Sequence, residues 1–176
     1  RKTGTPVRVK NSYNISSPGS IIVEEHTGKI APVCAITSVK NITLIDIVSS
    51  RMLGAAGFLA HVFNNFLKWN ISIDVIATSE VSVSLTVSSK DKLDGLISDL
   101  EAASEVTVKK GRAIVTIICD AAHSSAILAS GFSVLADEGI NVQMISQGAS
   151  KVNISIIVNE DEVEKTVQIL HNAYFN

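Results

Sequence analysis

The sequence has few charged residues, only two cysteines and no long apolar run, and each of these shortages excludes a class of protein. Charged residues make up 18% of the 176 positions and apolar residues 46%, which excludes intrinsic disorder, because disordered chains combine low hydrophobicity with high net charge. The 15 basic residues do not outnumber the 17 acidic ones, so no nucleic-acid partner is expected. Apolar runs fall far short of the ~20 residues of a membrane span, so no membrane partner is expected.

Catalytic motifs are missing as well. The sequence has no glycine-rich phosphate loop, no His-Glu-x-x-His motif and no cysteine pair at metal-binding spacing. We therefore expect no catalytic residues, no metal and no cofactor in this chain. Cys34 and Cys119 are typical of a reducing compartment, which predicts a cytoplasmic protein. The chain starts at Arg1 instead of Met, and we expect it to be a fragment of a longer protein.

Apolar periodicity from residue 32 onward predicts an α+β fold with the order β-α-β-β-α-β. Alternating β-branched residues predict strands, and apolar residues at helical spacing predict helices. The expected strands are 42–48, 71–77, 81–87 and 106–108, and the expected helices cover 57–69 and 93–100.

The same order then starts again about 70 residues further on, as residues 139–145 match residues 70–76. The second copy has expected strands at 113–119, 140–145 and 152–158. It also has an expected helix that starts at 127 and ends near Gly139, and another at 163–174. It lacks a fourth strand, which would leave a sheet edge exposed. We predict that a spare strand at 33–37 completes it, so that the first domain is inserted into the second. The alternative is that 33–37 extends the preceding linker.

The expected domains follow from this repeat. Residues 1–30 form a linker or arm, with one extended piece at 21–23, because they are rich in turn-forming residues. The first domain covers 41–110, and the second combines 31–40 with 111–176.

A candidate ligand site follows the first strand. The loop at 49–59 leads into a helix N-terminus, whose free N–H groups can bind a carboxylate, although it also fits a simple tight connection. Strand alternation would place Ile71, Ile73 and Val75 on one face and Ser72, Asp74 and Ile76 on the other. Asp74 interrupts this apolar strand, so it either lies on a solvated face or holds a cation. Together these groups would bind both ends of an amino acid. The second copy has Gln143 at the equivalent position, so a cationic ligand should prefer the first copy.

Three motifs, at 51–60, 70–86 and 139–155, resemble the C-terminal regulatory region of aspartate kinase, and the similarity is greatest to the monofunctional, plant-type, lysine-sensitive enzymes. The amino-acid kinase domain of that family, with its Lys-Phe-Gly-Gly motif, is absent. The resemblance implies two ferredoxin-like βαββαβ ACT domains, the first inserted into the second. It also implies a homodimer formed through these domains, with end-product amino acids bound at the ACT–ACT interface to inhibit the kinase.

The resemblance also implies the residues of the effector site. They are Met52, Ala55, Gly57, Phe58, Leu59, Ser72, Ile73, Asp74, Thr78, Ser79 and Glu80. Backbone N–H groups at 57–59 would hold the ligand carboxylate, and Asp74 and Glu80 would hold ammonium groups. Met52, Phe58 and Ile73 would line the aliphatic stem, although Met52 and Phe58 also fit plain core packing. A second effector site would use Asn141, Gln143, Met144 and Gln147.

The implied function is lysine sensing for feedback control of aspartate-family amino-acid biosynthesis. The alternatives are a threonine-sensing version of the same region, S-adenosylmethionine as a co-inhibitor, and a dimerisation module with no effector. The resemblance places ATP, Mg²⁺ and the formation of aspartyl phosphate in the kinase domain, outside this non-catalytic fragment. In a plant, the compartment would be the plastid stroma instead of the cytoplasm.

Overall fold

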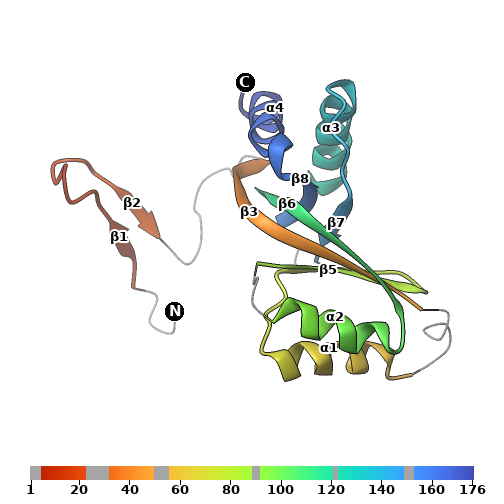
Figure 1. Cartoon of the computed structure of the whole chain (residues 1–176). Helices are drawn as coiled ribbons and strands as arrows, with labels where there is room; N and C mark the ends of the chain where they lie inside the picture. The colour runs from red at the N-terminus through yellow and green to blue at the C-terminus, as the bar shows by residue number, and fades with distance from the viewer. Residues whose placement is uncertain (1–4, 23–31, 50–55, 89–91, 121–122, 149–152) are drawn as a thin grey trace. The chain divides into compact units, whose positions relative to one another are not determined.

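The structure is a computed structural model, and it describes residues 5–22, 32–49, 56–88, 92–120, 123–148 and 153–176 (Figure 1). The chain divides into two compact units, Arg1–Ala31 and Pro32–Asn176. In the first unit, β1 (Val7–Val9) pairs antiparallel with β2 (Ser20–Ile22), and all residues of both strands are exposed. Residues 21 and 22 of the extended piece expected at 21–23 therefore belong to a two-stranded sheet, and residue 23 lies outside the described residues.

The second unit contains a six-stranded sheet in the order β4-β5-β3-β6-β8-β7, in which every neighbouring pair is antiparallel. Two long strands, β3 (Val33–Val48) and β6 (Glu105–Cys119), form its centre. The outer strands are β4 (Val75–Thr78), β5 (Ser82–Val87), β7 (Met144–Gln147) and β8 (Asn153–Asn159). Each long strand thus spans two strands that the sequence predicts separately.

Residues 33–39 of β3 pair with residues 114–119 of β6, in the second copy of the repeat. Residues 43–48 instead pair with β5 on one side and with residues 105–109 of β6 on the other. Between these stretches the β3–β6 register shifts twice, between Val39 and Ile42 and between Ile42 and Leu44. The segment at 33–37 therefore lies in the sheet beside the strand expected at 113–119.

Two helices cover each half of the sheet (Figure 1). The first half carries α1 (Phe58–Trp69) and α2 (Leu93–Glu101), and the second carries α3 (Ser124–Asp137), the short 3-10 helix η3 (Glu160–Glu162) and α4 (Val163–Phe175). Each pair buries one apolar stripe, as its periodicity predicts. No helix in the described ranges is long and apolar enough to cross a membrane.

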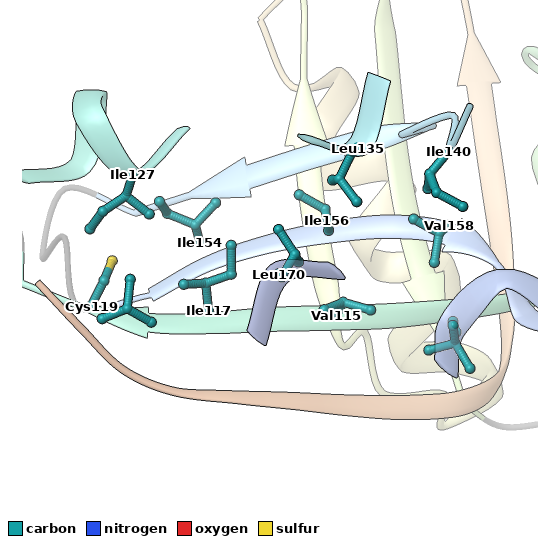
Figure 2. Close-up of a cluster of buried hydrophobic side chains, with 13 residues drawn as sticks. Val115, Ile117, Cys119, Ile127, Leu135, Ile140, Ile154, Ile156, Val158 and Leu170 are labelled. Carbon is teal, nitrogen blue, oxygen red and sulfur yellow. The ribbon is translucent and has the colours of Figure 1, made fainter. Parts of the chain in front are cut away.

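Three apolar cores hold the second unit together. One joins α1 and α2 to alternate residues of β3 and β5, and one joins α3 and α4 to β6 and β8 (Figure 2). The third uses the opposite faces of the strands and draws on both halves, with Ile42, Leu44, Ile114, Met144 and Ile157 as its buried members. The two outermost strands, β4 and β7, contact each other, and the Ser146 hydroxyl donates to the Ile76 carbonyl at 2.7 Å.

The strands expected at 71–77 and 140–145 begin later than the sequence predicts, at Val75 and Met144. The reason is the way in which the preceding helices end. Asn70 has φ 53°, and the Ile71 N–H donates to Phe66, which closes α1 with a left-handed cap. In the second copy Ile140 donates to Leu135 in the same manner. The chain then needs several residues to reach the sheet.

Candidate functional site

The N-terminus of α1 is open, as the candidate site requires. Gly57 precedes the helix with φ 94°, a left-handed conformation that favours glycine, and no side chain in the described part of the chain caps the first turn. The N–H groups at 58–60 lack partners within the helix, because no helical carbonyl precedes them, and the first turn contains no acidic residue. Phe58 packs against the first core, whereas Leu59 is exposed. Met52 and Ala55 lie outside the described residues.

The Asp74 carboxylate is exposed and accepts a hydrogen bond from the Ser88 hydroxyl at 2.6 Å. The Asp74 N–H donates to the Thr86 carbonyl at 2.9 Å, which fixes the residue at the start of β4, just outside the regular strand. The sequence prediction of the site missed Ser88. It could have been found from its position, because it directly follows the expected strand at 81–87, which forms a hairpin with the segment that contains Asp74.

The face assignment expected for 71–76 is partly wrong. Ile71, Ile73 and Val75 should share one face, but Ile71 and Ile73 belong to the first core and Val75 to the third. Ile76, expected on the opposite face from Ile73, packs against the first core with it. The alternation fails because the regular strand begins only at Val75, so residues 71–74 do not follow its period. Ser72 is exposed.

The turn at 78–80 connects β4 to β5 and is exposed. The Ser79 N–H donates to the Ser82 carbonyl at 2.9 Å, and the two hydroxyls lie 2.6 Å apart. Thr78 ends β4, opposite Val83, and Glu80 lies in the turn itself. These bonds hold the turn in place while the Glu80 side chain remains open to solvent.

The expected site residues fall toward opposite ends of α1. Gly57 directly precedes this helix of 12 residues, which is about 18 Å long, whereas Asp74 lies beyond its last residue. The turn at 78–80 lies at the end of the sheet from which the chain enters α1, because Val48, the last residue of β3, pairs with Ser82 (Figure 1). Within one chain the helix N-terminus and the 78–80 turn therefore share one end, and Asp74 lies at the other.

The second candidate set is engaged in the fold. The Gln143 side chain accepts from Arg112 Nε at 2.8 Å and donates to Asn159 Oδ1 at 2.7 Å, and Asn159 in turn donates to Glu162. Met144 is buried in the third core, while Asn141 and Gln147 are exposed. Asn159 is the repeat equivalent of Ser88, since the N–H groups of Gln143 and Asp74 bond to matching strand positions. The Gln143 side chain, unlike the Asp74 carboxylate, thus has its hydrogen-bond partners in a network that includes Arg112.

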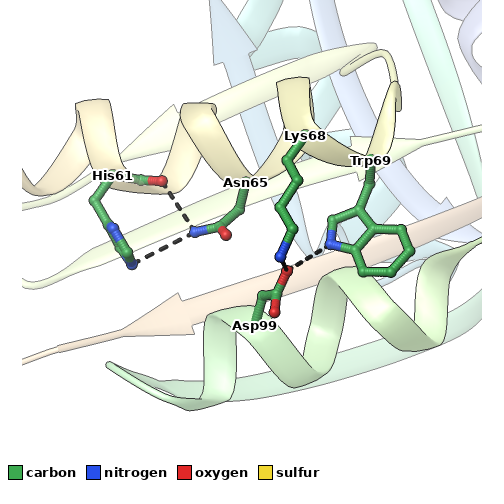
Figure 3. A network of polar contacts seen from close by, with 5 residues as sticks. All are labelled: His61, Asn65, Lys68, Trp69 and Asp99. Carbon is green, nitrogen blue, oxygen red and sulfur yellow. Dashed lines mark hydrogen bonds and ion pairs between the residues drawn. The ribbon is translucent and has the colours of Figure 1, made fainter.

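A polar network joins α1 to α2 on the first half (Figure 3). The Asp99 carboxylate accepts hydrogen bonds from Trp69 Nε1 at 2.6 Å and from Lys68 Nζ at 2.7 Å. The hydrogen bond from Lys68, followed by that from Trp69, lowers the pKa of Asp99 below its usual value. This network stabilises the helix pair. Among the described residues, no group of three or more His, Cys, Asp and Glu side chains could hold a metal ion.

A family model described as "ACT domain" matches residues 45–97 and 120–174. Aspartokinase 3, chloroplastic, from Arabidopsis thaliana is 48% identical over 184 residues, which cover 99% of this chain and 33% of that protein. The chain thus spans about a third of the length of this curated relative.

Two solved structures extend the likeness. The C-terminal regulatory domain of aspartate kinase from Porphyromonas gingivalis is 32% identical with a TM-score of 0.70, and the match covers 81% of this chain and 97% of that one. Escherichia coli aspartokinase III in complex with lysine and aspartate is 32% identical with a TM-score of 0.83, over 99% of this chain and 40% of that one.

Proposed function

Because this chain belongs to the ACT-domain family, as a regulatory region of the aspartate kinase type, we propose that it binds the end-product amino acid lysine and thereby controls an attached kinase. The lysine complex of Escherichia coli aspartokinase III supports this ligand class. We assign ATP-dependent phosphorylation of aspartate to the two thirds of such proteins that this chain does not cover. The chloroplastic plant relative favours the plastid stroma as the compartment.

One observation carries the proposal: the groups expected to bind the ligand carboxylate and one ammonium lie toward opposite ends of α1. The helix is about 18 Å long, and a free lysine is much shorter. If both groups bind one lysine, they must therefore come from two subunits. A two-fold axis that sets two α1 helices antiparallel would bring the N-terminus of one close to Asp74 of the other.

The exposed face of α1 suits such a dimer. Leu59, Phe63 and Leu67 follow one another at a spacing of four residues, and their exposed fractions are 37%, 39% and 76%. Contact with a second copy would remove this apolar stripe from water. We therefore propose a homodimer through the ACT domains, with the ligand at its interface.

Each ligand group then has a named partner. The N–H groups at 57–59 bind the carboxylate, because those of Phe58 and Leu59 lack partners within the helix and lie at the positive end of the helix dipole. Glu80, at the same end of the helix, binds one ammonium, and Asp74 of the second subunit binds the other. Phe58 and Ile73 line the stem, as would Met52. Two carboxylates suit the two ammonium groups of lysine, whereas threonine has only one.

We also propose the inserted arrangement of the two ACT domains, with 41–110 as the first and 31–40 plus 111–176 as the second. It is supported by the pairing of residues 33–39 with residues 114–119, which gives the second copy its fourth strand. The family model matches two segments, 45–97 and 120–174, and residues 33–39 belong to neither of them.

Isothermal titration with lysine and with threonine tests the proposed ligand. We expect a binding heat with lysine. In Asp74→Asn the affinity for lysine should fall about tenfold or more, since a charge-assisted hydrogen bond is lost. Asp137→Asn, which removes an exposed carboxylate at the end of α3, is the matched control and should bind lysine normally.

A second variant separates the interface from the ligand contacts. Phe63→Glu places a charge in the apolar stripe of α1 and should yield a monomer by light scattering that no longer binds lysine, although Asp74 is intact. A dimer that gives no heat with any amino acid would leave only a dimerisation module. Heat with threonine alone would identify a threonine sensor.

A further inference from the structure

A cavity of about 310 Å³ lies where the two long strands pass from one half of the sheet to the other. It is open at the surface and is lined by residues of β3, β6, α2 and η3, among them Asn41, Thr43, Asp94, Lys110, Gly111 and Glu160. None of these residues belongs to the lysine site proposed above or to the candidate set around Gln143.

Two opposite charges line this cavity without meeting a partner. Within the described part of the chain, neither the Lys110 ammonium nor the Asp94 carboxylate has a hydrogen bond or an ion pair. The adjacent Lys109, by contrast, pairs with Asp46 at 3.1 Å. A third charge, Glu160, is half-buried and accepts the Asn41 N–H at 3.0 Å. One cation and two anions thus surround a space that could hold a small molecule.

The backbone beside the cavity departs from regular strand geometry on both sides. Asn41 in β3 has φ 61° and Gly111 in β6 has φ 66°, and the register between the strands shifts at this point. Left-handed residues inside a strand interrupt its ladder, and a non-glycine residue such as Asn41 also costs free energy in this conformation. Such departures gather at ligand sites. A Cβ built on Gly111 meets no atom within 4 Å, so the space next to this backbone is open.

We propose that this cavity binds a free α-amino acid as a zwitterion, at a site separate from the lysine site. Lys110 holds the carboxylate, and Asp94 holds the ammonium together with Glu160, because Lys110 and Asp94 then each gain the opposite charge that they lack. The buried Thr43 adds a hydroxyl, and the side chains of Ile42 and Leu93, 1% and 5% exposed, form an apolar floor.

The place of the cavity gives the ligand a structural effect. Asp94 lies on α2 of the first half, whereas Glu160 begins η3 of the second half, so an ammonium between them ties the two halves together. A ligand that binds one arrangement of the halves more tightly shifts the population toward it. Bound at this point, an amino acid would therefore favour one arrangement of the two ACT domains.

Amide chemical shifts of the ¹⁵N-labelled chain test the site, with each of the twenty protein amino acids as the probe at millimolar concentration. We expect at least one of them to move the Asn41 and Gly111 signals in a saturable manner. The same shifts should occur in Asp74→Asn, so failure of the lysine site and failure of this one are distinguishable. No movement of these two signals with any of the twenty would overturn the proposal.

Two neighbouring lysines provide a matched pair of variants. Lys110→Met should weaken binding of the active amino acid by about tenfold or more, whereas Lys109→Met, which removes a lysine outside the cavity, should leave it unchanged. The N-acetyl and methyl-ester forms of the same amino acid, which each lack one charge, should both bind weakly. Equal affinity in Lys110→Met and the wild type, or equal losses in both variants, would refute the assignment.

Discussion

Asp99 connects two helices through a single carboxylate. Both of its partners, Lys68 and Trp69, lie at the end of α1, and Asp99 itself is on α2. Because both hydrogen bonds favour the charged form, the folded protein lowers the pKa of Asp99. The carboxylate therefore contributes stability above the pKa of the unfolded chain, and this contribution disappears as the pH falls through the lower folded value.

This linkage predicts how Asp99→Asn changes the pH dependence of stability. At neutral pH the variant should unfold at a lower denaturant concentration than the wild type, because it loses the ion pair with Lys68. As the pH falls through the lowered pKa of the folded Asp99, the wild type loses the same contribution and the two unfolding midpoints should converge. Asp137→Asn is the control and should show no such convergence. A difference that stays constant with pH would contradict the assignment.

At the scale of elements, each helix pair packs an aromatic ring over a glycine. A Cβ on Gly95 of α2 would strike the ring of Trp69, and a Cβ on Gly131 of α3 would strike the hydroxyl of Tyr174 on α4. The Tyr174 hydroxyl donates to the Ile127 carbonyl at 2.6 Å, and burial raises the pKa of Tyr174 to about 12. The two copies thus reach the same close approach with different residues.

Gly131→Ala tests this packing. Alanine should gain about 1 kcal/mol of helix propensity over glycine, but the clash with Tyr174 should cost about 1–3 kcal/mol, so the variant should be destabilised. In a Tyr174→Phe background the hydroxyl is gone, and the same substitution should be neutral or stabilising. Denaturant unfolding of the four proteins measures the coupling. Additive effects of the two substitutions would show that Gly131 does not need to be small.

The helices were predictable from the sequence because apolar spacing reports directly on one buried face, as at Val62 and Phe66 of α1. The first residues of the strands were less predictable than the helices. Ile71 and Ile140 are apolar and β-branched, yet both are buried as parts of the helix caps, which precede the strands. An apolar residue just after a helix thus fits a cap and a strand equally well, and only the backbone bond to Phe66 or Leu135 decides between them.

At the scale of the whole molecule, the sequence predicts which faces of the strands are apolar but not what those faces meet. Leu44 and Ile45 are both buried, on opposite faces of β3, so alternation alone cannot reveal the third core. The same limit applies to the candidate site. The sequence places Gly57 just before α1 and Asp74 shortly after it. It does not show how far apart the two residues lie in space, because that distance depends on how the helix packs against the sheet.

The long strands β3 and β6 lead to a prediction about the domains themselves. If the first ACT domain is inserted into the second, then excision of residues 42–110 should leave the second domain able to fold. The excision joins Asn41 to Gly111, and both residues already have positive φ, as short hairpin loops require. Val39 and Ile114, which pair in the structure, would then flank the new loop.

We expect the excised chain to unfold cooperatively, with helix and strand signals in circular dichroism, although at lower stability. The third core loses Ile42 and Leu44, which exposes Ile114 and Ile157, and each exposed side chain costs about 1.5–3 kcal/mol. A companion excision with Ile114→Thr and Ile157→Thr limits aggregation through that face.

Further removal of residues 32–39 is the decisive control. If the strand at 33–37 completes the second domain, cooperative unfolding should be lost, because β6 becomes an open edge. If this segment is only a linker, its removal should change nothing, and the inserted arrangement would be refuted.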